Sequence, residues 1–330
     1  MDLHDLARHH VVSTRDATRL GLGPSDLRRM VKLGEVRRLI RGWYAVCPPN
    51  AAQAPWEGVD EWETARLEHR LLTIALLRSF EGRVVASHQS ALVLHGVRLW
   101  KSDLTAAHVC RAGDDHTRRR PGAFLHPSCG AEPVQTADGF TTVPVARAVV
   151  QVGLCPPRQG LPPFPFESLV AADGALHQGM VTQEELDAAV KAHARQPGVQ
   201  GVRALLAHAD GRHESVGETR LAHTMRVLGY RFTPQVWVTA DGRRWRADFA
   251  LDDDPVLVEF DGLTKYSGGL TDPTPEQLRT TLAQEKRRED RLRGTGREVV
   301  RFMWAEADDA HVVQTRLDAA IARSRRRLGA

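Results

Sequence analysis

The feature that most constrains this chain is the pair Asp241-Gly242, which stands between two runs of alternating apolar and polar residues. Asp-Gly in this setting is typical of a two-residue β-hairpin turn, because both central residues of that turn adopt positive φ angles. A two-residue turn fixes the register of the strands on either side. It therefore predicts that Gln235 of the first strand stands opposite Asp248 of the second.

A second turn, DDDP at 252–255, leads into the apolar run VLVEFD. A four-residue loop here places Asp248 opposite Glu259. The same register places Arg246 opposite Asp261. Successive side chains of a strand point to opposite faces, so Glu259 and Asp261 are expected to share one face. The other face of this third strand is expected to be apolar, with Val256, Val258 and Phe260.

The register builds a row of polar side chains across three strands, Gln235, Asp248 and Glu259. Directly opposed residues have Cβ atoms about 4.5–5.5 Å apart, and two carboxylates at that distance repel each other. A cation between them would remove the repulsion, and hard oxygen ligands suit Mg²⁺ or Mn²⁺, which activate water for attack on a phosphodiester. We expect Glu218, on the inward stripe of the preceding helix, to be a third metal ligand or to orient a metal-bound water. Lys265, just beyond the third strand, would add positive charge near a phosphate.

The first 46 residues are predicted to form a winged helix-turn-helix DNA-binding domain. Three short helices and then a hairpin are expected at 2–10, 13–22, 25–34 and 35–46. Ser25 is expected to cap the third helix and Gly34 to end it. The residues of the third helix that are expected in the core are Leu27, Met30, Val31 and Leu33.

Basic residues lie on both elements that contact DNA in this fold, the third helix and the wing. They are Arg28, Arg29, Lys32, Arg37, Arg38 and Arg41. We expect these side chains to bind the phosphates of duplex DNA, and the alternative is a solvated basic face. The net charge of the chain is only +4, but clustered bases matter more than the sum for a nucleic-acid partner.

The composition, with 42% hydrophobic and 26% charged residues in 330, is that of a soluble globular protein of two or three domains. No apolar run approaches the roughly 20 residues that cross a bilayer, and the first ten residues do not resemble a signal peptide. We therefore expect a cytoplasmic protein with no membrane partner. The four cysteines have no CxxC spacing and are interpreted as free thiols.

A linker is predicted at 47–60, followed by a middle α/β region at 61–210. The middle region shows no catalytic constellation in its sequence. Its histidines are scattered along the chain and are interpreted as structural or surface residues rather than as ligands. They include His88, His95, His108 and His126.

The segment from about 211 to 325 resembles the PD-(D/E)XK nucleases, and within them the branch of very-short-patch-repair endonucleases. The resemblance rests on a helix Glu, a strand Asp and a Glu on the next strand, and on the motifs GETRL, PQVWV, RADFAL, VLVEFDGLTKY and EKRREDRLRGTGREVVRF. It implies a restriction-endonuclease-like α/β domain over 211–330 that cleaves DNA with Mg²⁺ or Mn²⁺. The residues expected in its catalytic site are Glu218, Gln235, Asp248, Glu259, Asp261 and Lys265, and the expected metal ligands are Glu218, Asp248 and Glu259.

The chain departs from this family at one position. The family has Glu-x-Lys on the last strand, where this chain has Glu259-x-Asp261. Lys265, or Lys286 in the charged segment LAQEKRREDRLR, would have to replace the missing lysine. Lys286 is also expected to contact a DNA backbone, and Arg301 to point toward the acidic row or a phosphate. A nuclease fold that only binds is the alternative.

Residues 1–46 resemble the N-terminal winged helix of AbiEi-type antitoxins, and the motifs VVASHQSALVLHG and DGFTTVPVARAVV resemble the middle portion of such proteins. Together the resemblances imply a multi-domain α+β protein that binds DNA. One expected function is metal-dependent DNA endonuclease activity. The alternative is a transcriptional repressor that acts as the antitoxin of an AbiEi-type toxin–antitoxin pair, with a cognate toxin as partner and an idle nuclease-like domain.

Overall fold

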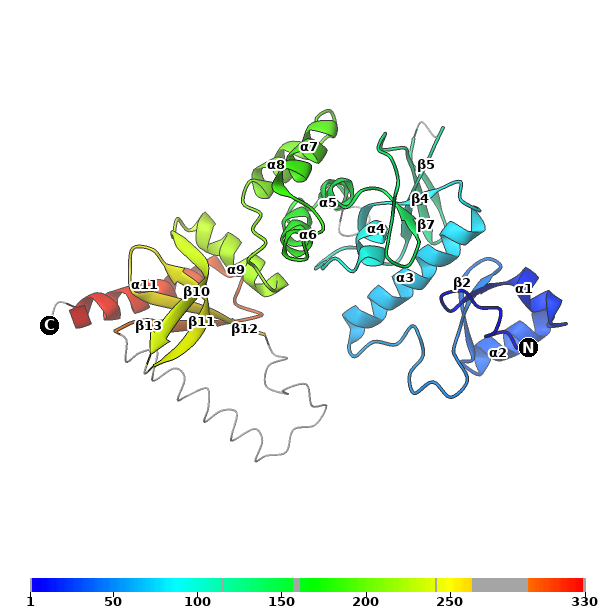
Figure 1. The fold of residues 1–330 in the computed structure, drawn as a ribbon, viewed down its shortest axis with the longest axis horizontal. Helices are drawn as coiled ribbons and strands as arrows, with labels where there is room; N and C mark the ends of the chain where they lie inside the picture. Colours follow the sequence, from blue (N-terminus) through cyan, green and yellow to red (C-terminus); the bar gives the residue numbers. More distant parts are fainter. Residues whose placement is uncertain (1, 114–115, 157–160, 241, 263–295, 329–330) are drawn as a thin grey trace. The chain divides into compact units, whose positions relative to one another are not determined.

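The computed structural model of the protein describes residues 2–113, 116–156, 161–240, 242–262 and 296–328 (Figure 1). The chain divides into two compact units, Met1–Ala209 and Asp210–Ala330. Both units combine helices with a sheet, so the chain is a mixed α/β protein of more than one domain. Within the described ranges, no helix is long and apolar enough to span a bilayer.

The N-terminal domain, residues 2–46, contains two short helices followed by a two-stranded hairpin. Its elements are β1 (Val11–Ser13), α1 (Thr14–Arg19), α2 (Pro24–Lys32), β2 (Val36–Ile40) and β3 (Trp43–Val46). The strands form an antiparallel sheet in the order β1-β3-β2. The buried core of the domain consists of Leu3, Val12, Ala17, Leu27, Val36 and Val46. This arrangement is consistent with the winged helix-turn-helix expected from the sequence.

The helix expected at 2–10 is wrong, because that segment forms turns. Arg8 and Val11 exchange two backbone hydrogen bonds, each of 3.1 Å, around His9 and His10. The two histidines have φ angles of 52° and 63°, which a right-handed helix does not contain. The tight turn brings the chain directly into β1.

The helix α2 begins one residue before the position expected from the sequence. Its N-cap is Gly23 and not the predicted Ser25, and the Asp26 carboxylate accepts a 2.9 Å hydrogen bond from the Gly23 N–H. Pro24 occupies the first helical position, where the backbone N–H has no partner within the helix, so proline costs no hydrogen bond there. Gly34 lies just after the helix with a φ of 75°, as expected for a glycine that ends a helix.

The core face of α2 is narrower than expected. Leu27 is buried, and Met30 packs against the core of the domain. Val31 and Leu33 are 40% and 65% exposed, so their assignment to the core is wrong. Leu33 follows the last helical residue, so the helical periodicity does not predict which way its side chain points.

The rest of the first unit combines a six-stranded sheet with helices. Its helices are α3 (Glu61–Ser79), α4 (His88–His95), α5 (Val145–Gly153), α6 (Phe166–His177), α7 (Gln183–Ala192) and α8 (Val199–Leu206). Its strands are β4 (Val85–Ala86), β5 (Ala107–Arg111), β6 (Arg118–Arg120), β7 (Ala123–Pro127), β8 (Val134–Gln135) and β9 (Thr141–Thr142). The strand order is β6-β7-β5-β4-β9-β8, and β5 and β7 are parallel.

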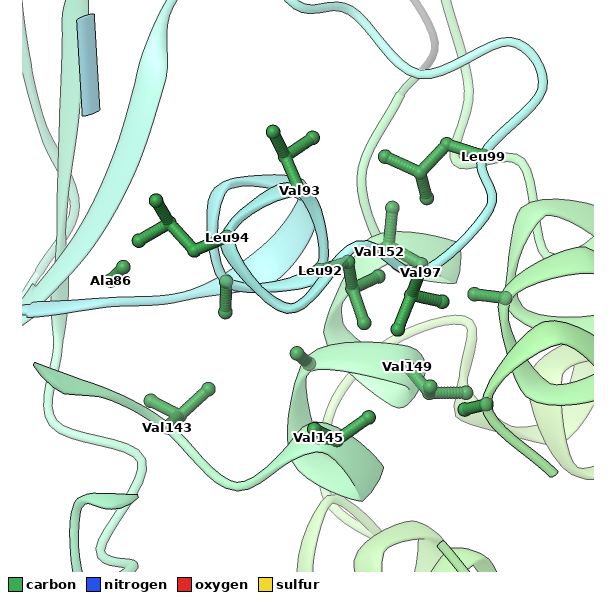
Figure 2. Close-up of a cluster of buried hydrophobic side chains, with 14 of the residues drawn as sticks. Ala86, Leu92, Val93, Leu94, Val97, Leu99, Val143, Val145, Val149 and Val152 are labelled. Carbon is green, nitrogen blue, oxygen red and sulfur yellow. The ribbon is translucent and has the colours of Figure 1, made fainter. Parts of the chain in front are cut away.

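The largest apolar core of this unit includes α4 and α5 (Figure 2). Leu92 of α4 and Val149 of α5 are both fully buried in it. The same cluster includes Ala45 of β3, so the N-terminal domain shares a core with the middle region. The contact is extended by Arg78 of α3, whose guanidinium carbon lies 4.9 Å from the centroid of the Trp43 ring.

The second unit contains a four-stranded sheet and the helices that precede and follow it. Its elements are α9 (Val216–Val227), β10 (Phe232–Ala240), β11 (Arg243–Leu251), β12 (Val256–Asp261), β13 (Glu298–Met303) and α11 (Ala310–Leu328). The strand order is β10-β11-β12-β13. The first two pairs are antiparallel, and β13 runs parallel to β12.

The predicted register of these strands is confirmed by the pairs around the polar row. Those pairs are Pro234 with Phe249, Val236 with Ala247, Phe249 with Val258 and Ala250 with Leu257. Gln235 and Asp248 therefore stand at opposed positions, and Asp248 and Glu259 do so across the next pair of strands.

The strand β10 changes the direction of its side chains at the polar row. Gln235 has a φ of 55°, an irregularity that re-aims side chains as a β-bulge does. Phe232, before it, packs against the cluster that contains residues of α9 and α11. Val236 and Val238, after it, belong to the cluster of the opposite face. The alternation expected for β12 is confirmed, because Leu257 also belongs to that opposite cluster and the residues of the first cluster are Val256, Val258 and Phe260.

Candidate functional site

The six bases predicted to bind DNA all lie at exposed positions of the N-terminal domain. On α2 they are Arg28, Arg29 and Lys32, and on the hairpin they are Arg37, Arg38 and Arg41. The helix α2 packs against β2, so neighbouring elements carry the two groups. The structure therefore presents cations from both elements that a winged helix uses to contact DNA.

Two of these bases have acidic neighbours. Arg37 forms an ion pair of 2.7 Å with Glu68 of α3, and Arg29 lies 3.7 Å from Asp26. Exposed ion pairs stabilise a fold by only about 0–1 kcal/mol, so a phosphate could replace either partner at little cost. The pair with Glu68 nevertheless ties the wing to the middle region.

The tip of the hairpin is held against the start of α1. Thr14 donates its backbone N–H at 2.8 Å and its hydroxyl at 3.1 Å to the carbonyl oxygen of Gly42. Gly42 has a φ of 80°, and a Cβ atom there would lie 3.1 Å from the Thr14 hydroxyl oxygen. Both constraints favour glycine, and they fix the position of the neighbouring Arg41.

In the second unit, Glu218 lies in the first turn of α9 and is only 6% exposed. Ser215 caps this helix by accepting a hydrogen bond of 3.1 Å from the Glu218 N–H. The Glu218 carboxylate accepts in return from the Ser215 hydroxyl at 2.8 Å and from the Glu214 N–H at 2.9 Å. It also accepts a 2.9 Å bond from the side-chain amide of Gln235. These donors explain how a carboxylate is tolerated on an inward face, and they bring Glu218 and Gln235 together.

The two strand carboxylates also have protein donors. The Asp248 carboxylate accepts a hydrogen bond of 2.7 Å from the backbone N–H of Phe260. Glu259, which is 6% exposed, accepts a 2.9 Å bond from the guanidinium of Arg301, its partner in the parallel pair of β12 and β13. The structure thus directs Arg301 to the acidic row, one of the two orientations expected from the sequence.

The remaining residues predicted for this site are less closely tied to the row. Asp261 is half-buried at the end of β12. Arg246, expected opposite it, forms an ion pair of 2.6 Å with Glu214. Lys265 and Lys286 lie outside the described residues, so their predicted roles stay predictions.

The donor chemistry of Asp248 and Glu259 suits Mg²⁺ or Mn²⁺, which take one or two carboxylates and keep several waters. Among the described residues, the clusters of three possible metal ligands within 4.8 Å of one another lie in the first unit and not in this row. Glu218 is engaged by the cap of α9 and by Gln235. The row therefore suits a site with two protein carboxylates better than a site with three.

The middle region contains a cavity that sequence reasoning missed, with a volume of about 770 Å³. Its wall includes His88, His108 and His126, so these histidines, which are scattered along the sequence, lie close together in the fold. The His88 and His126 rings stack with centroids 4.0 Å apart, and His108 Nδ1 lies 2.9 Å from His126 Nε2. No sequence signal joins them, because they are gathered by the parallel pairing of β5 with β7 and by the packing of α4.

Burial controls the protonation of this cavity. It lowers the pKa values of His88 and His108 well below the usual 6.5, and repulsion from His126 adds to the effect. Burial likewise lowers the pKa of His126 to about 4. It raises the pKa of the Cys155 thiol, which also lines the cavity, to about 12. At neutral pH these three imidazoles and the Cys155 thiol are therefore uncharged.

Two short helices and a basic hairpin make up the N-terminal domain, an arrangement consistent with a winged helix-turn-helix. Residues 1–46 match the family model described as "Transcriptional regulator, AbiEi antitoxin", so this segment is similar to the regulator domain of that family. Two proteins of Mycobacterium tuberculosis, uncharacterized protein Rv2248 of strain H37Rv and uncharacterized protein MT2308 of strain CDC 1551, are each 28% identical to the chain over 236 residues. The similarity covers 70% of this chain and 76% of each relative.

Proposed function

We propose that this protein is a DNA-binding transcription regulator of the AbiEi antitoxin type, in which α2 and the β2–β3 hairpin contact duplex DNA. The observation that carries the proposal is the set of six exposed bases on neighbouring elements of a domain that matches this family. A cognate toxin would be its protein partner, and the cytoplasm, where the chromosome lies, would be its location.

The test of this proposal measures how strongly DNA binding depends on salt. Each phosphate that a base neutralises contributes about 0.9 to the slope of log K against log salt concentration for duplex DNA. Replacing Arg28, Arg29 and Lys32 by alanine is therefore expected to weaken binding and to reduce the slope by up to about 2.7. Fluorescence anisotropy with a labelled duplex, over a series of salt concentrations, measures both quantities.

A matched control removes the same charge from another surface of the same unit. Lys191, Arg195 and Arg203 are exposed residues in and between α7 and α8. Their triple alanine variant should keep the affinity and the salt slope of the wild type. If the variant of α2 also keeps both, α2 does not contact DNA and the proposal is wrong for this helix.

A second function, metal-dependent hydrolysis of a phosphodiester, is proposed for the C-terminal unit. The observation that favours it is the polar row, in which Asp248 and Glu259 stand opposed and Gln235 bonds to Glu218. Asp248 and Glu259 would hold a Mg²⁺ or Mn²⁺ ion, which supplies an activated water when bound. Arg301, now bonded to Glu259, would bring positive charge to the scissile phosphate. The nuclease-like fold of this unit, as inferred from its motifs, belongs to the same proposal.

Incubation of the full chain with single- and double-stranded DNA, with Mn²⁺ or with EDTA, tests this activity. We expect cleavage only with Mn²⁺, and its loss in the variant Glu259→Gln. The control Asp252→Asn removes an exposed carboxylate from the turn between β11 and β12 and should leave cleavage intact. No cleavage of either DNA by the wild type would leave the unit without this function, and the regulator proposal would be unaffected.

A further inference from the structure

Three possible metal ligands meet in the cavity of the middle region, in elements that neither proposed function uses. His88 begins α4, His108 lies in β5, and Cys155 follows α5. One ligand atom from each, two imidazole nitrogens and the thiol sulfur, lies within 4.8 Å of the other two. Both histidines are buried and Cys155 is half-buried, so this is a cluster inside the fold.

The backbone holds His88 in an unusual conformation. Its φ is 53°, in the left-handed region that residues other than glycine seldom adopt. Its backbone N–H donates a 3.1 Å hydrogen bond to the side-chain oxygen of Gln151 in α5. Conformations of this kind persist where the surrounding structure enforces them, often at ligand sites. Here the effect is to direct the imidazole of a helix-terminal residue into the cavity.

Hydrogen bonds outside the trio orient both rings. His88 Nδ1 lies 2.9 Å from the Ser87 hydroxyl, and His108 Nδ1 lies 2.9 Å from His126 Nε2. His126 Nδ1 is in turn 3.1 Å from the hydroxyl of Thr117. Histidines that bind metals almost always have such a partner on their other ring nitrogen, which sets the tautomer and the ring orientation. The arrangement therefore leaves Nε2 of His88 and of His108 for a ligand.

The chemical types of the three ligands determine which cation they prefer. Two imidazoles and a thiol suit a borderline metal such as Zn²⁺ and do not suit Mg²⁺ or Ca²⁺, which prefer oxygen. With Zn–N and Zn–S bonds of about 2.0–2.1 and 2.3 Å, the ligand atoms of a tetrahedral site lie roughly 3.3–3.7 Å apart. Ligand atoms that already lie within 4.8 Å of one another need to approach by at most about 1.1–1.5 Å to reach that geometry.

We propose that His88, His108 and Cys155 bind one Zn²⁺ ion. Three protein ligands leave the fourth position of a tetrahedral zinc ion open, and here it opens into a cavity of about 770 Å³. The thiol releases its proton to solvent when the metal binds, since zinc takes the thiolate. The neutral imidazoles bind without losing a proton. His126 acts as a positioning residue through its hydrogen bond to His108.

The experiment uses the full chain, freed of any histidine tag and of metal, and titrated with Co²⁺ as a spectroscopic substitute for Zn²⁺. We expect one equivalent to produce a thiolate-to-cobalt charge-transfer band with visible d–d bands, and Zn²⁺ to displace it at one per chain. Cys155→Ser should remove the charge-transfer band. It should also weaken Zn²⁺ binding by more than the roughly 10–100-fold that the loss of an outer-shell partner costs.

Two matched controls separate this site from adventitious binding. Cys47→Ser changes another half-buried cysteine, and His95→Gln changes a half-buried histidine that hydrogen-bonds to Thr142. Both should keep the cobalt spectrum, and His108→Gln should lose it. The proposal is overturned if the wild type shows no thiolate band, or if the band survives in Cys155→Ser.

A measurement on the wild type covers the case in which a variant fails to fold. Zn²⁺ should slow alkylation of Cys155 by iodoacetamide, read by mass spectrometry of its peptide, and should leave the alkylation of Cys47 unchanged. Equal alkylation of Cys155 with and without Zn²⁺ would contradict the proposal.

Discussion

Replacing Asp248 by alanine is expected to destabilise the second unit by about 1–3 kcal/mol, the cost of leaving a buried donor without its acceptor. The donor is the backbone N–H of Phe260, which lies 2.7 Å from the Asp248 carboxylate. Phe260 itself is only 5% exposed, so water is a poor substitute. Asp248→Asn keeps an oxygen acceptor but loses the charge that strengthens the bond, and we expect it to cost about 1 kcal/mol.

Hydrogen exchange read by mass spectrometry measures this loss of stability in the second unit separately from the first. The amides of β12 should exchange roughly 5- to 150-fold faster in Asp248→Ala, because about 1.4 kcal/mol corresponds to a factor of ten. The control Asp252→Asn changes an exposed carboxylate that accepts from the Thr233 hydroxyl. Its effect should stay within about 0.5 kcal/mol.

The same measurement with Mn²⁺ separates a structural aspartate from a metal ligand. A cation bound only to the folded state at 100 times its Kd stabilises that state by about 2.7 kcal/mol. If Asp248 holds such an ion, Mn²⁺ should slow exchange in the wild type and have no effect in Asp248→Asn. Equal exchange in Asp248→Ala and Asp252→Asn, without metal, would refute the argument from the hydrogen bond to Phe260.

Two further predictions concern packing and pH. Gly217→Ala should destabilise the second unit by about 1–3 kcal/mol through overpacking, because the new Cβ would lie 2.0 Å from the Phe260 ring. Urea unfolding measures this change in stability. An unchanged free energy of unfolding would contradict the close approach of α9 to β12. Burial lowers the pKa of His69 to about 4. Below pH 6.5 the unfolded chain therefore binds a proton at this histidine that the folded chain does not bind. The folded state consequently loses stability as the pH falls toward 4. We expect this histidine to reduce the free energy of unfolding of the first unit by about 2 kcal/mol between pH 7.5 and 5, and the same urea midpoint at both pH values would oppose it.

The sequence by itself determined the features that depend on neighbours along the chain. The two-residue turn before Arg243 and the loop at 252–255 set the register of three strands, because a short connection allows few alignments. The resemblance of the first 46 residues to AbiEi-type antitoxins depended on the same kind of local pattern, and the family match agrees with it. The helical period of α2 and the predicted hairpin were enough to predict that the six bases of the N-terminal domain are exposed.

Local patterns failed where a segment is controlled by contacts distant in sequence. The helix expected at 2–10 gives way to turns, because Val11 enters a sheet with β3, whose sequence lies more than thirty residues later. Alternation cannot foresee that β10 changes face at Gln235. It also cannot foresee that Glu218 finds its donors in Ser215 and Gln235.

Tertiary structure alone decided where the histidines of the middle region lie. His88, His108 and His126 belong to a helix and two strands, and nothing in their spacing shows that β5 pairs in parallel with β7. Parallel strands are joined by crossovers whose length does not set the register, so sequence separation carries no information about which side chains meet. The cluster exists because burial of the apolar residues of α4, α5 and the sheet brings those three elements together, and the imidazoles are carried into the cavity with them.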